Sequence, residues 1–160
     1  MKKITNVMLA VAMTISLMSF SAAATSSEDC ASQVVWSQNG ITVEIIEGNS
    51  VSPRAVLFQG TYTGEGPYSV QGNCVAAEGN CVNVYIDNTD GNGDLYPVFN
   101  LYGTEVSSSQ FMLEQGKDFT YRITRQDMGD IEGPLIVTVH SRDGHMMNFF
   151  IRARQFVYVP

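Results

Sequence analysis

Residues 119–124 read Phe-Thr-Tyr-Arg-Ile-Thr, an alternation of large apolar side chains with polar ones. Because successive side chains of a strand point to opposite faces, this period of two predicts a β-strand with one face against a core and one in water. The same alternation recurs in residues 41–45, 81–87 and 135–139. The sequence therefore predicts a protein built from short, two-faced strands.

Further strands are expected over residues 55–62, 96–102 and 148–159, with Gly, Asn, Asp and Pro between them. Asp143-Gly144, before the last strand, is typical of a β-hairpin, because Gly adopts positive φ without steric cost. A change of phase near Gln155 predicts a bulge or a change of partner, and a helical turn is plausible only over residues 107–113. Seven to nine short strands predict an all-β fold, an antiparallel β-sandwich.

One segment is similar to a motif of a known family. It comprises residues 113–123, Leu-Glu-Gln-Gly-Lys-Asp-Phe-Thr-Tyr-Arg-Ile. They resemble the leucine, turn glycine and aromatic-led strand of fibronectin type III and related immunoglobulin-like domains. In such domains the aromatic is normally a tyrosine whose hydroxyl bonds back across the corner. Phe119 takes that position here and has no hydroxyl. The resemblance implies an immunoglobulin-like plan without the corner bond, and a fold of this kind does not define a function.

The first 24 residues have the three regions of a secretory signal peptide: Lys2 and Lys3, an apolar middle, and Ala22-Ala23-Ala24 as a cleavage site. A membrane anchor is the alternative, because the uncharged stretch approaches the roughly 20 residues that cross a bilayer. The serines and the alanine run favour cleavage. We expect bacterial-type export to the periplasm or beyond, a single mature domain over residues 25–160, and no membrane span after cleavage.

The amino-acid composition excludes some classes of function. Removal of residues 1–24 leaves 7 basic residues against 16 acidic ones, a net charge of −9. Nucleic acid is therefore a poor partner, because no basic face can neutralise phosphates. The chain has two histidines, no Gly-x-Ser-x-Gly elbow and no phosphate-binding glycine loop. We expect a protein that is not an enzyme and that binds a protein or glycan partner.

The mature chain contains Cys30, Cys74 and Cys81. In an oxidising compartment two of them are expected to pair, and three pairings are possible. Cys74 and Cys81 flank a short segment that ends in Gly-Asn, which favours a disulfide between them. Cys30 would then be a free thiol, an intermolecular link or a tie to one of the other two.

Residues 87–94, Asp-Asn-Thr-Asp-Gly-Asn-Gly-Asp, form the richest candidate site, here called the acidic loop. Calcium prefers several hard oxygen ligands, and Asp87, Asp90, Asn92 and Asp94 could supply them. The spacing differs from that of a helix-loop-helix calcium site. The favoured alternative is a solvated loop whose Asn, Asp and Gly satisfy turn geometry. No cofactor other than calcium is expected.

A second metal hypothesis concerns copper, whose ligands include imidazole and thioether. His140, His145, Met146 and Met147 lie close together in the sequence. A histidine in a turn and methionines in the core explain the same residues and are favoured.

Two further features could serve binding. Three aromatic side chains are the least required by a core: Trp36, and Tyr85 and Tyr102, which flank the acidic loop in the sequence. Such rings can contact sugars or proteins. Residues 153–160 resemble the C-terminal strand of chaperone-usher pilus subunits, and an ordinary terminal strand is the favoured alternative. We therefore expect an exported binding or structural protein of unknown ligand. The alternatives are a calcium- or copper-binding module and a subunit of a pilus-like surface assembly.

Overall fold

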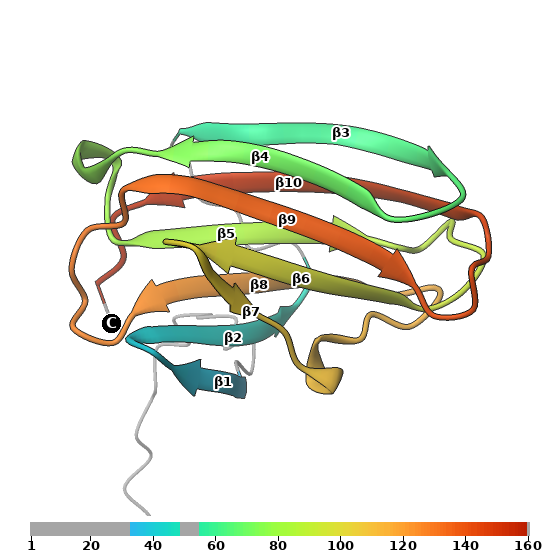
Figure 1. Cartoon of the computed structure of the whole chain (residues 1–160), viewed down its shortest axis with the longest axis horizontal. Coiled ribbons are helices and arrows are strands. Elements are labelled where there is room, and N and C mark those ends of the chain that lie inside the picture. The colour runs from blue at the N-terminus through green and yellow to red at the C-terminus, as the bar shows by residue number, and fades with distance from the viewer. Residues whose placement is uncertain (1–32, 49–54, 160) are drawn as a thin grey trace, which may run out of the picture.

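A computed structural model describes residues 33–48 and 55–159, which form two antiparallel sheets packed face to face (Figure 1). The all-β sandwich expected from the sequence is confirmed. The described residues form ten strands, against the seven to nine expected. Within these residues no helix is long and apolar enough to span a membrane.

One sheet has six strands and the other has four. In spatial order the larger sheet comprises β1 (Gln33–Gln38), β2 (Ile41–Glu47), β8 (Asp118–Arg125), β5 (Cys81–Asp87), β10 (Met147–Phe156) and β3 (Val56–Gly64). The smaller sheet comprises β4 (Tyr68–Cys74), β9 (Gly133–Ser141), β6 (Leu95–Leu101) and β7 (Thr104–Val106). Two short 3₁₀ helices complete the described elements, η1 (Ala76–Glu78) and η2 (Ser109–Phe111), and η2 lies where a helical turn was expected.

The core lies between the sheets and follows the alternation read from the sequence. In β10, Met147, Phe149 and Ile151 are buried, while the residues between them are only partly covered. Aromatic rings fill the centre of the core, with centroids 5.3 to 6.0 Å apart among Phe99, Phe111 and Tyr121. Rings at these separations stabilise the core beyond the area that they bury.

A tyrosine on β8, Tyr121, forms a hydrogen bond to the backbone ten residues upstream. The hydroxyl of Tyr121 donates to the carbonyl of Phe111 over 2.7 Å, and Tyr121 is fully buried. Burial raises the pKa of this hydroxyl. The immunoglobulin-like plan itself stays a prediction.

The structure revises two other expectations. The alternation of β10 continues through Gln155, which is fully buried, so the expected change of phase does not occur. The expected bulge is present close by, in the pairing with β3, where Ala153 and Arg154 face Phe58 and Val56. Asp143-Gly144 does not close a hairpin, because β9 and β10 belong to different sheets. Turn chemistry indicated a reversal of the chain correctly but could not show that the chain also changes sheet.

Candidate binding surfaces

The acidic loop is organised around the buried side chain of Asn88. Its amide nitrogen donates to the carbonyls of Gly93 and Glu114 over 2.9 and 3.2 Å, and its exposed fraction is 0%. Its backbone carbonyl accepts from Gly91 and Gly116 over 3.1 and 3.0 Å. These bonds tie the acidic loop to the segment before β8, so that turn geometry accounts for much of its composition.

The four expected calcium ligands have separate surroundings. Asp87 accepts from the hydroxyl and the amide of Thr89, at 2.6 and 3.0 Å. Asp94 accepts from the amide of Gln115 over 3.2 Å, and Asn92 donates to the carbonyl of Met146 over 3.5 Å. Asp87 and Asp90 share a small pocket of about 170 Å³, which Asp94 and Asn92 do not line. Among the described residues no three His, Cys, Asp or Glu side chains are grouped to hold a metal. Calcium binding stays a prediction.

A pair of carboxylates faces outward beside this pocket. Asp87 and Asp118 lie opposite each other on β5 and β8. The hydroxyl of Tyr85 lies 3.3 Å from Asp87 and 3.1 Å from Asp118, so that it can donate to either carboxylate. Burial raises the pKa of Tyr85, and the bond to Asp118 raises it further. The phenol therefore remains protonated and bridges two like charges that would otherwise repel.

The four expected copper ligands do not share one surface. Met147 is fully buried in the core, whereas Met146 is 48% exposed. His140 is exposed on β9, at the position opposite Tyr96, and His145 lies against Gly93 in the loop that leads to β10. This placement matches the alternative of a loop histidine and a core methionine, and copper binding stays a prediction.

The expected disulfide is absent: Cys74 and Cys81 are both free and buried. Cys74 belongs to the core, whereas Cys81 precedes the inward-facing Val82 on β5 and therefore points to the outer face of that sheet. The two thiols thus lie on opposite sides of the six-stranded sheet and cannot join. Cys30 lies outside the described residues.

Burial of these thiols predicts a loss of stability at alkaline pH. It raises the pKa of Cys74 from 9.0 to about 11 and that of Cys81 to about 12. Unfolded thiols lose their protons near pH 9 while the folded thiols keep them, so the free energy of unfolding falls as the pH rises from there toward the folded pKa values. Urea midpoints measured from about pH 8 to about pH 10 should decline.

A matched control is available for this prediction. The Cys74→Ala, Cys81→Ala double variant should show a shallower decline, because two of the groups responsible are gone. Both thiols should also resist alkylation in the folded protein, since the thiolate is the reactive form. A urea midpoint that stays constant with pH, or rapid alkylation of the folded protein, would contradict the assignment.

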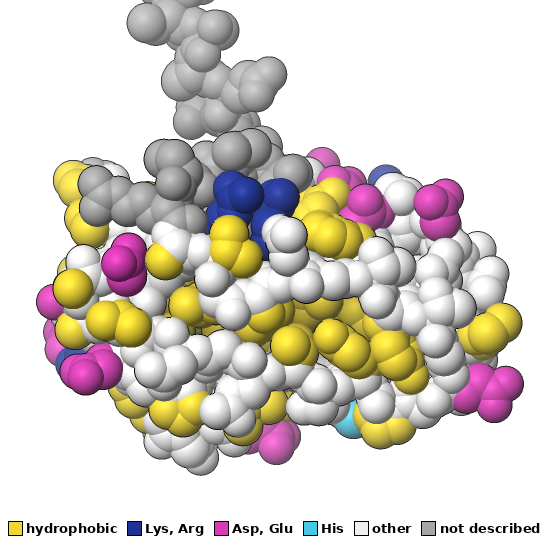
Figure 2. All heavy atoms as spheres, turned by 90° about the horizontal axis from the view of Figure 1, so that it is seen from above, with side chains coloured by type: hydrophobic (Ala, Val, Ile, Leu, Met, Phe, Trp, Pro, Cys, Tyr) yellow, Lys and Arg dark blue, Asp and Glu magenta, His cyan; other side chains and the backbone are white. Residues whose placement is uncertain are grey.

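On one lateral side of the sandwich, no strand among the described residues pairs with the outer edge of either sheet. β3 ends the six-stranded sheet and β4 ends the four-stranded sheet, and Figure 1 shows both at the top of the molecule. Figure 2 looks onto this side and shows a band of hydrophobic side chains along its middle. The half-buried apolar side chains from these two strands are Leu57, Phe58, Tyr62, Tyr68 and Val70. We call β3 and β4 together the open edge.

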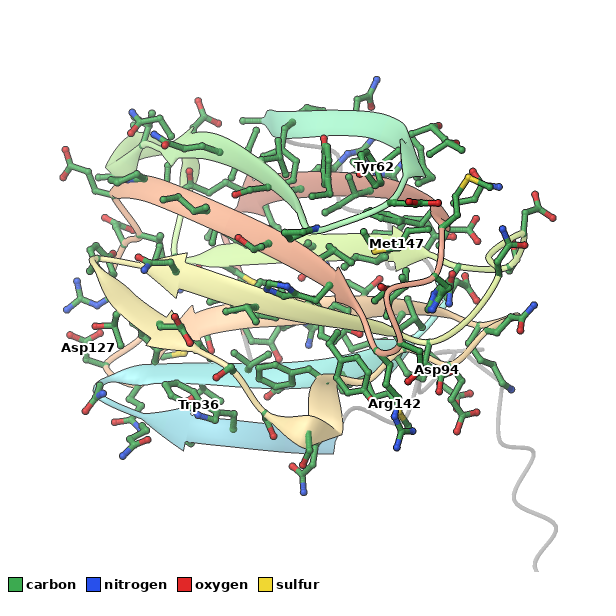
Figure 3. All side chains as sticks on the ribbon, turned by 45° about the vertical axis from the view of Figure 1, so that its right-hand side comes forward. Trp36, Tyr62, Asp94, Asp127, Arg142 and Met147 are labelled. Atoms are coloured by element: carbon green, nitrogen blue, oxygen red, sulfur yellow. The ribbon has the colours of Figure 1, made fainter. Side chains whose placement is uncertain are left out.

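The turns at one end of the sandwich enclose a pocket of about 410 Å³, here called the turn-end pocket. It is lined by Asn39, Gly40, Ile41, Tyr102, Arg125, Gln126 and Asp127. Figure 3 shows Asp127 at the opposite end of the molecule from Asp94. Tyr102 follows the strand that leads away from the acidic loop, so it does not flank that loop as the sequence suggested. Tyr85 does lie beside it.

Comparisons with known proteins gave no family for this chain: no protein-family model, no curated protein sequence and no solved structure matched. The class that the described residues define is an antiparallel β-sandwich.

Proposed function

We propose that this protein is an exported, non-catalytic β-sandwich that assembles with further copies of itself through the open edge. The observation that carries the proposal is that the terminal strands of both sheets on this side of the molecule, β3 and β4, are uncharged. From Ala55 to Ala77 the sequence contains a single charged residue, Glu65. Export, inferred from the signal peptide, would supply the compartment in which such an assembly forms.

Edge strands without charges are unusual in a protein with a mature net charge of −9. Natural sheets commonly protect their edges with lysine, proline or bulges, because free backbone N–H and C=O groups can pair with another strand. β3 and β4 contain neither a charged residue nor a proline, and their register carries one bulge, in β3 opposite Ala153 and Arg154. A second copy could therefore pair with β3 and β4 without bringing together like charges from these two strands.

A second copy suits this edge better than a single peptide strand. A two-fold axis along the normal to the sheets would place β3 beside its counterpart and β4 beside its counterpart, each pair antiparallel. Both sheets would continue across the interface, and the half-buried Leu57, Tyr62 and Tyr68 would be covered. One added peptide strand would pair with one edge and leave the other open.

The opposite side of the sandwich is less suited to a two-fold contact of this kind. There the six-stranded sheet ends in β1, and the four-stranded sheet ends in β7, which has three residues and carries Glu105. A two-fold contact at that side would pair only one long strand and would bring two glutamates together. The geometry therefore favours the open edge.

Sedimentation velocity of the mature chain tests the proposal. We expect the wild type to form dimers or larger species at micromolar concentration. The Gln59→Lys, Gln71→Lys double variant should associate about a hundredfold more weakly, because like charges would meet across the interface. Both glutamines are exposed on the open edge. Gln38→Lys is the matched control, since Gln38 is exposed at the opposite side.

Thermal melts should show that all three proteins fold. A wild-type protein that stays monomeric at every concentration would overturn the proposal. So would equal weakening by Gln38→Lys and by the double variant, because the contact would then not lie at the open edge.

A further inference from the structure

The turn-end pocket is formed by three connections that converge at one end of the sandwich. They are the β1–β2 turn at Asn39-Gly40, the β6–β7 turn at Tyr102-Gly103, and the segment that follows Arg125. Ile41 contributes a buried apolar residue to the lining. A pocket of about 410 Å³ lies within the range of small-molecule sites, which is roughly 300–1,000 Å³.

Two turns of the same kind allow the pocket residues to be compared. Asn39-Gly40 has φ values of 53° and 78°, and Tyr102-Gly103 has 56° and 74°. Each joins two directly paired strands as a two-residue loop, since Gln38 faces Ile41 and Leu101 faces Thr104. Such turns favour Asn-Gly, because both central residues need positive φ.

Tyr102 therefore occupies a position that asparagine would fill with less strain. A bulky residue in the left-handed region costs about 1–3 kcal/mol. Its hydroxyl accepts from the amide of Glu132 over 3.1 Å and lies 3.5 Å from the carbonyl of Asp130. These contacts offset part of the strain, yet 46% of the side chain stays exposed. An exposed aromatic ring held in a strained backbone at the rim of a pocket suggests a role in binding.

The charged groups of the pocket neutralise each other. The guanidinium of Arg125 forms two parallel bonds with the carboxylate of Asp127, one of them 2.9 Å long from Nε. Hydrogen bonds from the amide of Gly129 and from Arg125 lower the pKa of Asp127, so the pair stays ionised near neutral pH. The pocket thus offers polar, planar groups without a net charge.

The neighbouring amide group is held in place as well. The backbone of Gln126 donates to the carbonyl of Gly40, and its side chain donates to the hydroxyl of Ser37, both over 2.8 Å. Groups that are already fixed lose little freedom when a ligand arrives.

We propose that the turn-end pocket binds a neutral saccharide. A sugar ring has an apolar face, which the ring of Tyr102 can contact, and an edge of hydroxyls, which donate to and accept from planar polar groups. Arg125, Gln126 and Asp127 supply such groups. A net-neutral lining favours an uncharged ligand over a phosphate or a carboxylate, which would find the guanidinium already paired.

Nuclear magnetic resonance of the isotope-labelled mature protein tests this. The probes are the methyl glycosides of glucose, galactose and mannose, and N-acetylglucosamine. We expect at least one of them to shift the amide signals of residues 39–41, 102–103 and 125–127, with millimolar affinity.

Two variants separate binding from stability. Tyr102→Asn removes the ring and relieves the backbone, so it should lower the affinity at least about tenfold while the protein stays folded. Tyr102→Phe keeps the ring and should bind within about threefold of the wild type. The pocket assignment fails if no probe shifts these signals, if the shifts map elsewhere, or if Tyr102→Asn binds as tightly as the wild type. None of these outcomes depends on whether the chain self-assembles.

Discussion

Replacement of Gln155 by leucine should lower the free energy of unfolding by about 3–5 kcal/mol, because it would leave several buried backbone groups without partners. The side-chain amide of Gln155 is fully buried and lies within hydrogen-bond distance of four backbone groups. Its nitrogen donates to the carbonyls of Val75, Gly79 and Ile131 over 3.0, 2.8 and 2.7 Å, and its oxygen accepts from the amide of Val75 over 2.8 Å.

This one residue joins three parts of the chain. It connects β10 to the loop around η1 and to the segment before β9, and the amide of Ile131 also donates to Gly79 over 3.1 Å. Leucine has a similar volume, so the loss would come from the unpaired amide and carbonyls rather than from a cavity.

Urea unfolding, followed by the fluorescence of Trp36, measures the change. Gln110→Leu is the matched control: Gln110 is exposed, and we expect its replacement to change the free energy of unfolding by less than about 0.5 kcal/mol. A loss below about 1 kcal/mol for Gln155→Leu would show that water or a rearranged backbone satisfies these groups.

Gln155 also illustrates why sequence reasoning failed in part. The inward positions of β10 run from Met147 in steps of two to Gln155, so the period was correct throughout. A polar residue at an inward position looks like a break in phase. Its partners are 24 to 80 residues away in the sequence, so no local pattern reveals them.

The strands that were missed have weaker alternation. β4 places Tyr68, Val70, Gly72 and Cys74 inward, and two of these four side chains are small. The inward position of Gly72 has a packing reason, because a Cβ there would lie 2.8 Å from that of Leu57. Periodicity detects strands through large apolar residues, so a strand that packs closely through glycine escapes it.

The sequence predicted one of the candidate sites and missed another. The acidic loop was found because its composition is local, but the partners that tie it to the segment before β8 lie more than twenty residues away. The turn-end pocket combines residues from three turns, and only the register of the strands brings them together. The Asn39-Gly40 and Tyr102-Gly103 dipeptides were the local indications available.

Replacement of Asn88 by alanine is expected to destabilise the protein by about 2–4 kcal/mol. The change would remove the donor to the carbonyls of Gly93, Leu113 and Glu114, and it would leave a cavity at a fully buried position. Asn92→Ala is the matched control within the same loop. Asn92 is exposed and makes one long bond to Met146, so its loss should cost less than about 0.5 kcal/mol.

Asn88→Asp separates hydrogen bonding from packing, because it keeps the shape of the side chain and removes the amide donors. If the donors matter, this variant destabilises at least as much as Asn88→Ala, since a carboxylate would face carbonyl oxygens. If packing alone matters, it resembles the wild type. Melts repeated with millimolar calcium then test the metal hypothesis. A site at Asp87, Asp90, Asn92 and Asp94 would raise the wild-type melting temperature, and Asn88→Ala would abolish the shift by releasing the loop that holds these side chains. An unchanged melting temperature for the wild type would contradict calcium binding. The hydrogen bonds of Asn88 and the turn geometry would then explain the composition of the acidic loop.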